Sequence, residues 1–290
     1  MAQAPSEKWV IVNGLDFHYR DWGGSGQPMV LLHGLASSCH IWDMVAPILA
    51  KDYAVIALDQ RGHGESAKPT EGYDFASVTQ DVLGVIDYLE GPPPIVVGHS
   101  WGGSVALELA VRAPKSLQGM AWVDGGMINA SARYDSVEDA KLEMSPPDFT
   151  GVKLEDFKER VRNRHQGGGM APGSHEVVMA NFEVLADQTI KAWLTRANHL
   201  RIIEALWDHR PVQLYKQVQC PVLIMPARQQ ADPSTQDRGQ RRMFSVGEAE
   251  EMLPNSKTVW LENSVHDVPI QRPELVAEVL KSHINDGFFG

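Results

Sequence analysis

The chain has 290 residues, of which 43% are hydrophobic and 22% are charged, and its formal net charge is −11. This composition is typical of a soluble globular protein, and the acidic balance argues against nucleic acid and anionic lipid as partners, because both call for clustered lysine and arginine. We expect one main domain with a substantial insertion, since single α/β domains often run to roughly 250 residues.

The N-terminal half alternates strand-like runs with stretches of helical spacing. Asn13-Gly14 separates two short runs, residues 8–12 and 15–21, which predicts a β-hairpin. Beyond it we predict strands at 29–32, 53–58, 95–97 and 119–123, and helices at 41–50, 78–89 and 100–113. Ser77 is the expected cap of the second helix, and Pro114 ends the third. This alternation predicts a parallel sheet covered by helices on both faces.

The pattern changes between residues 125 and 217. Strand-like runs disappear there, and helical stretches are predicted at 154–164, 177–186 and 193–207. The strand pattern returns at 221–225 and 258–261, and a last helix is expected at 274–284. We therefore predict a core made of residues 1–126 and 218–290, and a helical cap, or lid, made of residues 127–217.

The two cysteines and the N-terminus bear on the cellular compartment. Cys39 and Cys220 lie far apart and form no CxxC pair, so we expect two reduced thiols. Residues 1–9 are polar and lack the apolar stretch of a signal peptide. Because no segment approaches the ~20 apolar residues of a membrane span, we expect a cytoplasmic protein with no membrane partner.

The segment from Gly98 to Gly103 contains G-x-S-x-G directly after a predicted strand and directly before a predicted helix. A sharp turn in this context exposes the hydroxyl of Ser100, and the glycines on either side leave room for close backbone approach. The N-terminus of the following helix places partial positive charge beside a developing oxyanion. These features predict Ser100 as a nucleophile rather than as a simple helix cap.

Acyl transfer also needs two hydrogen-bond donors for the oxyanion. We predict the backbone N–H of Trp101, the residue after the nucleophile, and the backbone N–H of Leu35, which follows His33-Gly34 at a strand end. His33 itself is expected to organise that loop as a buried, hydrogen-bonded side chain.

A serine hydroxyl needs an adjacent base at neutral pH. Of the 11 histidines, His266 alone follows a C-terminal strand in the chain order serine, acid, histidine. A histidine there can take the proton of the serine and return it to the leaving group. We therefore predict His266 as the base.

Five segments together resemble the α/β-hydrolase superfamily: LLHG (31–34), DQRGHGES (59–66), GHSWGG (98–103), PVLIMPA (221–227) and HDVPIQRPE (266–274). The resemblance implies the α/β-hydrolase fold, with a mostly parallel eight-stranded sheet flanked by helices and a helical cap insertion. It places the chain near serine esterases and lactonases. It also implies a structural role for the loop around His63.

The resemblance places the catalytic acid after either of two strands. Asp124 ends one of them, 24 residues after Ser100, which is similar to haloalkane dehalogenases and some lactone-cleaving relatives. Asp232 follows the other strand, five residues after Ala227, where the family usually shows a shorter spacing. We favour Asp124 and keep Asp232 as the alternative.

We expect a serine hydrolase that cleaves a carboxylic ester or lactone through a covalent acyl-Ser100 intermediate. Epoxide hydrolases and haloalkane dehalogenases of this family use an aspartate nucleophile, so Ser100 argues against both activities. The alternatives are a C–C bond hydrolase, an acyltransferase or a cofactor-free perhydrolase with haloperoxidase activity. A non-catalytic ligand-binding receptor is the alternative from another class.

The substrate is expected to be a small, apolar ester or lactone, because the cap offers apolar side chains near the predicted entrance. We predict Met127, Trp193 and Trp207 as substrate-binding residues, while most other apolar residues of the cap pack its helices together. The chain shows neither a G-x-x-x-x-G-K-S/T loop nor an HExxH motif, so we expect no cofactor and no metal site. No pattern predicts an oligomeric state.

Overall fold

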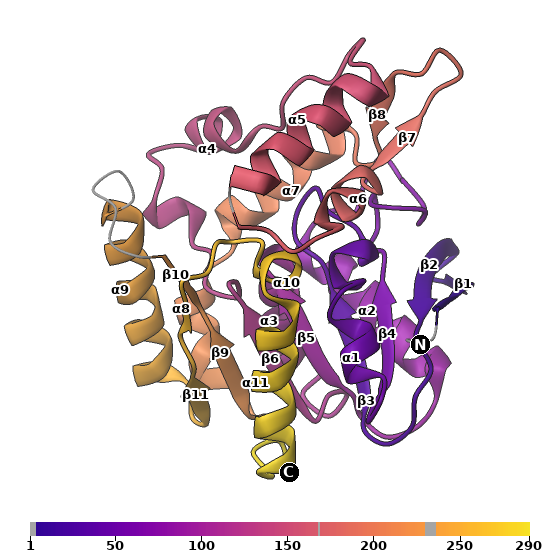
Figure 1. Cartoon of the computed structure of the whole chain (residues 1–290). Coiled ribbons are helices and arrows are strands. Elements are labelled where there is room, and N and C mark those ends of the chain that lie inside the picture. Colours follow the sequence, from indigo (N-terminus) through magenta and orange to yellow (C-terminus); the bar gives the residue numbers. More distant parts are fainter. Residues whose placement is uncertain (1–3, 168, 230–235) are drawn as a thin grey trace.

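The computed structural model describes residues 4–167, 169–229 and 236–290 (Figure 1). Its centre is an eight-stranded sheet in the order β1-β2-β4-β3-β5-β6-β9-β11. β1 pairs with β2, and β2 with β4, in antiparallel fashion, and the remaining neighbours pair in parallel. The predicted fold, a mostly parallel eight-stranded sheet, is confirmed. The strands are β1 (Ser6–Val12), β2 (Leu15–Asp21), β3 (Pro28–Leu32), β4 (Ala54–Leu58), β5 (Ile95–His99), β6 (Gly119–Val123), β9 (Val222–Met225) and β11 (Ser256–Thr258).

Helices cover both faces of this sheet because successive residues of a buried strand point to opposite sides. In β3, Val30 and Leu32 join one apolar cluster, whereas Met29 and Leu31 join the other. Residues of α2, α3 and α9 fill the first cluster, and residues of α1, α10 and α11 fill the second. The bounds of these helices are α1 (Ala46–Leu49), α2 (Phe75–Leu89), α3 (Trp101–Arg112), α9 (Gln236–Met252), α10 (Val268–Gln271) and α11 (Pro273–Asn285).

Two local expectations are corrected near the N-terminus. α2 is capped by Asp74, whose side chain accepts a hydrogen bond from the backbone N–H of Ser77, so Ser77 is not the cap. The helix expected at 41–50 is a 3₁₀ turn over Cys39–Trp42 followed by the short helix α1. Pro47 lies at the start of α1, where its missing N–H needs no partner, and it cannot lie in the interior of a longer helix.

Between β6 and β9 the chain leaves the sheet and forms a separate layer above the carboxyl ends of the strands (Figure 1). This layer contains one antiparallel hairpin as well as helices, so the expectation of no strands there was wrong. The helix predicted at 177–186 ends at Met179. Asp187 then accepts hydrogen bonds from Thr189, which stabilises the tight turn of the hairpin. The elements are α4 (Val137–Met144), α5 (Leu154–Gly167), α6 (Ser174–Met179), β7 (Phe182–Val184), β8 (Ile190–Ala192), α7 (Arg196–Asp208) and α8 (Pro211–Leu214).

The strand expected at 258–261 is divided between two sheets. β11 pairs with β9, whereas β12 (Leu261–Glu262) pairs with β10 (Ala227–Arg228) in a separate two-stranded ladder. This ladder lies next to the loop that carries His266. Within the described parts of the chain, no helix is both long enough and apolar enough to cross a lipid bilayer.

Candidate active site

Ser100 lies in a sharp turn between β5 and α3, with φ 52° and ψ −119°. Its backbone N–H donates to the carbonyl of Val123 at 3.1 Å, which ties the turn to the neighbouring strand β6. Glycines make the turn possible. A Cβ at Gly98 would lie 2.3 Å from the carbonyl oxygen of Gly102, and a Cβ at Gly102 would lie 2.6 Å from that of Leu32. Both distances are too short for any side chain, so the two glycines are required by packing.

Ser100, His266 and Asp124 form one chain of hydrogen bonds. The Ser100 hydroxyl lies 3.0 Å from Nε2 of His266, and Nδ1 of His266 lies 2.7 Å from Oδ2 of Asp124. Because a carboxylate only accepts, Nδ1 carries the proton and Nε2 is left free to accept from the serine. The alternative acid, Asp232, lies outside the described residues.

Asp124 is held from several sides. Its side chain is only 1% exposed, Oδ1 accepts from the backbone N–H of Ala227 at 2.9 Å, and Oδ2 accepts from Arg242 at 2.9 Å as well as from His266. Burial raises the pKa of Asp124, but the hydrogen bond and charge of His266 and the charge of Arg242 lower it, and the balance is a pKa below the usual range. Asp124 is therefore ionised at neutral pH.

The pKa of His266 is shifted in the opposite direction. Packing around its ring lowers the pKa of His266, but the hydrogen bond and negative charge of Asp124 raise it, and the net pKa lies above the ordinary histidine value. The ring itself is half exposed, at 51%. It can therefore exchange protons with a bound substrate or water.

The loop that carries His266 is fixed by two further side chains. His99 donates from Nε2 to the backbone carbonyl of His266 at 2.9 Å, and Gln271 accepts from the backbone N–H of Val265 at 2.7 Å. Burial, and then the nearby charge of His266, lower the pKa of His99 to about 4. His99 therefore stays neutral over the pH range in which His266 titrates. Sequence reasoning treated His99 only as part of the serine motif.

The loop after β3 lies directly beside Ser100. A Cβ on Gly34 would be 3.0 Å from Cβ of Ser100. His33 donates from Nδ1 to the carbonyl of Gly34 at 2.8 Å, and Nε2 of His63 accepts from the backbone N–H of Ala36 at 3.3 Å. Because the peptide bond is trans, the N–H of Leu35 points away from the carbonyl that His33 holds.

The second predicted oxyanion donor is at the start of α3. Trp101 is the first residue of that helix, and the first N–H groups of a helix have no partner within it. This N–H and that of Leu35 therefore belong to two segments next to Ser100: the start of α3, which follows it in the chain, and the loop after β3, which packs against it.

The three predicted substrate-binding residues lie in different surroundings. Met127 is half-buried and packs against the apolar cluster that contains Trp101. Trp193 lies beneath the ammonium of Lys68, 4.8 Å from the ring centre. Trp207 lies in the last turn of α7, where its carbonyl accepts from Arg210. Contact of any of them with a substrate stays a prediction.

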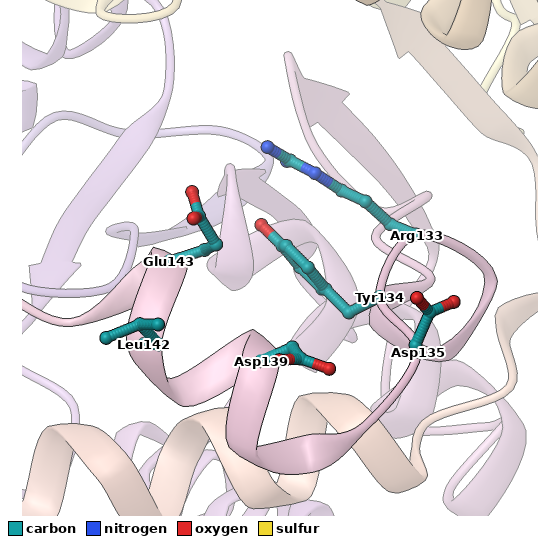
Figure 2. Close-up of a pocket in the computed structure, with 6 residues that line it drawn as sticks. All are labelled: Arg133, Tyr134, Asp135, Asp139, Leu142 and Glu143. Atoms are coloured by element: carbon teal, nitrogen blue, oxygen red, sulfur yellow. The ribbon is translucent and has the colours of Figure 1, made fainter.

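A surface pocket of about 250 Å³ lies on the layer formed between β6 and β9, between the segment around Tyr134 and α4 (Figure 2). In Figure 2 the Tyr134 ring lies between Arg133 and Glu143, and the guanidinium of Arg133 is 4.9 Å from the ring centre. Ser100, Asp124 and His266 are not among its lining residues, which are Arg133, Tyr134, Asp135, Asp139, Leu142 and Glu143.

Two groups of side chains among the described residues bring three potential metal ligands together. The first is the buried trio His18, Cys39 and Asp59, and the second consists of His99, His266 and Asp267. In the first trio, Asp59 already accepts from Nδ1 of His18 at 2.8 Å and from the backbone N–H of Cys39 at 2.7 Å. In the second, the two nitrogens of His266 face Ser100 and Asp124. Binding a metal would disrupt hydrogen bonds in either group.

Comparisons with known proteins agree with this architecture. Residues 29–279 match the model of the "Alpha/beta hydrolase family". A soluble epoxide hydrolase from Corynebacterium sp. (strain C12) is 44% identical over 101 residues, which cover 35% of this chain and 35% of the relative. A haloalkane dehalogenase from Mesorhizobium japonicum is 26% identical over 198 residues, covering 68% of this chain and 57% of the relative. The chain thus spans between a third and three fifths of the length of these relatives.

The likeness in structure extends over nearly the whole chain. The crystal structure of E-2-(acetamidomethylene)succinate hydrolase superposes with a TM-score of 0.77 at 19% identity, and the match covers 97% of this chain and 99% of the other. At this identity the likeness concerns the fold alone. The family match covers most of the chain, from the second residue of β3 to beyond β12. The chain belongs to the alpha/beta hydrolase family.

Proposed function

We propose that the protein is a serine hydrolase that cleaves a carboxylic ester or lactone through a covalent acyl-Ser100 intermediate. The observation that carries the proposal is the chain of hydrogen bonds from Ser100 through His266 to Asp124, at 3.0 Å and 2.7 Å. This is the arrangement in which a histidine activates a serine and a carboxylate orients the histidine.

The proposed reaction has two halves. In the first, Nε2 of His266 takes the hydroxyl proton while Oγ of Ser100 attacks the carbonyl carbon, and the N–H groups of Leu35 and Trp101 bind the oxyanion. His266 then gives the proton to the leaving alkoxide, which departs as the alcohol from an ester and stays attached to the acyl group as a hydroxyl when a lactone ring opens. In the second half, His266 deprotonates a water that attacks the acyl-serine, and the carboxylic acid leaves as the serine recovers its proton.

A serine nucleophile argues against epoxide hydrolysis and dehalogenation, the activities that the names of the relatives give. Attack by a serine oxygen on an epoxide or halogen-bearing carbon would form an alkyl ether. An ether has no carbonyl for water to attack, so the enzyme would stop after one event. Attack on an ester carbonyl forms an acyl-serine, which the same histidine and water can hydrolyse. Ser100 therefore supports ester or lactone cleavage.

The substrate is proposed to carry an apolar acyl or alcohol group. Met127, at the start of the segment 127–217, and Trp193 and Trp207, in its last third, are half-buried. Binding pockets for small molecules are lined mostly by such side chains. We propose that these three residues contact the apolar part of the substrate.

The test is a panel of p-nitrophenyl esters of increasing acyl length, with γ- and δ-lactones alongside. The Ser100→Ala variant is expected to lose turnover by about 10⁴-fold or more, because the nucleophile is removed. Stopped-flow measurement should show a burst of nitrophenol equal to the enzyme concentration wherever deacylation limits the rate. Ser282→Ala, an exposed serine of α11, is the matched control and should keep full activity.

Two results would overturn the proposal. One is turnover that survives unchanged in Ser100→Ala. The other is a purified, folded enzyme that hydrolyses no ester or lactone of the panel but cleaves a C–C bond in a Ser100-dependent way, which would replace the substrate class while keeping the nucleophile.

A further inference from the structure

Arg242 approaches the triad from α9, an element that contributes none of the three predicted catalytic side chains. One terminal nitrogen of its guanidinium donates to Oδ2 of Asp124 at 2.9 Å, and the other donates to the backbone carbonyl of Ala227 at 2.7 Å. Ala227 in turn donates its N–H to Oδ1 of Asp124 at 2.9 Å. Asp124, Ala227 and Arg242 thus form a closed ring of hydrogen bonds behind the histidine.

Oδ2 of Asp124 is shared between Arg242 and His266. His266 lies 2.7 Å from this oxygen, against 2.9 Å for Arg242. Asp124 is almost completely buried, and the Arg242 side chain is one quarter exposed. A carboxylate that is already paired with a cation stabilises a second cation less, because the charges of the two cations oppose each other.

We propose that Arg242 is a positioning residue of this site, which fixes the carboxylate plane of Asp124 for His266 and weakens the attraction of Asp124 for the imidazolium. The inference rests on the proposed function, because it assigns Asp124 and His266 their roles in ester or lactone cleavage. A less basic His266 is unprotonated at lower pH, and it is a stronger acid toward the leaving alkoxide. Arg242 therefore widens the pH range of the reaction at its acidic end.

Several charged or titratable groups on different elements face His266 and change its pKa. Asp124 at the end of β6 and Asp267, the next residue in the chain, both favour the protonated ring. Arg242 from α9 disfavours it. His99 from β5 is neutral above about pH 4 and adds no charge where His266 titrates. Among these groups, the cation Arg242 therefore opposes the effect of the two carboxylates on the pKa of His266.

The experiment uses the full-length protein with Arg242→Gln, Arg242→Lys and, as the matched control, Arg241→Gln. Arg241 is the exposed neighbour on the same helix, so its loss changes the net charge equally. Two readouts are compared: the pH profile of kcat/KM on the best p-nitrophenyl ester, and the NMR titration of the His266 ring, which is identified by its absence in His266→Gln.

In the wild type, kcat/KM should rise with pH through a single midpoint above 6.5, because His266 must be unprotonated to act as base. Arg242→Gln should move both the kinetic and the NMR midpoint upward by about 0.5 pH unit, and should lower kcat at the plateau by about fivefold. Arg242→Lys should restore the midpoint but not the full kcat, since an ammonium keeps the charge without the two-pronged geometry. Arg241→Gln should change neither.

A purely structural role gives a different outcome. If Arg242 only anchors α9, Arg242→Gln lowers the melting temperature while both midpoints stay at the wild-type value, and the inference is wrong. If Arg242→Gln does not fold, an Arg242→Lys variant with unaltered midpoint and unaltered kcat also contradicts it. If the wild type shows no Ser100-dependent turnover, the proposed function fails, but the NMR titration still decides whether Arg242 acts on His266.

Discussion

Ser100 and Asp124 share an uncommon backbone conformation, with positive φ values of 52° and 46° although neither is a glycine. Each follows the last residue of its strand, and the two strands are neighbours in the sheet. Their N–H groups donate to Val123 and Met225 on the adjoining strands. Such conformations cost of order 1–3 kcal/mol each and persist where the surroundings impose them. Here they direct both side chains toward one histidine.

The first residue-scale prediction concerns the choice of acid. Asp124→Asn is expected to lower kcat by about 10⁴-fold, because an amide nitrogen facing Nδ1 of His266 favours the wrong tautomer. Asp232→Asn should stay within about threefold of the wild type. Steady-state kinetics of the two variants on the same ester test the ranking. The reverse ranking would move the acid to the segment after β10.

The serine and the histidine could be predicted from the sequence because each is marked by residues next to it in the chain. Ser100 has its glycines, and His266 follows a strand at the expected end of the chain. The choice between Asp124 and Asp232 needed a family resemblance. Arg242 carried no signal, because it contacts Asp124 across 118 positions of sequence and lies next to Arg241, which is exposed.

At the scale of elements, the serine turn packs directly against the end of β3 and the loop that follows it. A Cβ on Gly102 would lie 2.6 Å from the carbonyl oxygen of Leu32 and 2.7 Å from that of His33. These contacts are with the backbone at the end of β3 and at the start of the loop that carries Leu35, so this backbone would have to move away. The packing of α3 against β3 thus sets the position of the proposed oxyanion donor.

Gly102→Ala is therefore expected to destabilise the fold by about 2 kcal/mol and to lower kcat at least tenfold. Gly247→Ala on α9 is the matched control, because a Cβ there has open space and alanine favours a helix by up to about 1 kcal/mol over glycine. Denaturant titrations and kinetics measure the two effects. Wild-type kcat in a folded Gly102→Ala variant would contradict the link between the glycine and the oxyanion loop.

The elements with strong local patterns were predicted well, and those that depend on distant partners were not. The first hairpin has Asn13-Gly14 at its turn, with φ values of 53° and 75°, and the pairing was expected. The cap hairpin was missed because its strands are only three residues long. Its Phe182 packs edge-on to Phe149 and Phe157, with ring centres 4.8 Å away. A contact of this kind leaves no periodic trace in the sequence.

For the whole molecule, buried histidines determine how stability responds to acid. Burial is the largest cause that lowers the pKa of five histidines, to about 4 in two cases. Two further histidines have a raised pKa. The lowered group consists of His33, His63, His99, His199 and His209, and the raised group of His18 and His266. A histidine whose pKa is lower in the folded state binds fewer protons there than when unfolded. Its contribution is complete above the unfolded value of about 6.5 and is lost as the pH falls toward the folded value.

The free energy of unfolding should therefore fall as the pH drops from 6.5 to 4, since the lowered group outnumbers the raised one. Each fully buried histidine of this kind contributes a slope of about 1.4 kcal/mol per pH unit in that window. His209→Gln should flatten the curve, because His209 is 3% exposed and its folded pKa is about 4. Melting temperatures of both proteins at pH 7.5, 6 and 5 test this. Equal losses in the two proteins would show that His209 does not take part.

The close packing of Gly125 against Ser100 limits which residues after β6 can change in evolution. Asp124 is followed directly by Gly125 and Gly126, and a Cβ on Gly125 would lie 2.2 Å from the carbonyl oxygen of Ser100. Substitution at Gly125 would therefore disturb Ser100 itself, whereas the segment that leads back to β9, residues 209–221, contains no glycine. Selection for a new substrate can therefore alter residues 127–217, whereas Gly125 is inherited together with Ser100, because the two are packed too closely for a side chain to fit between them.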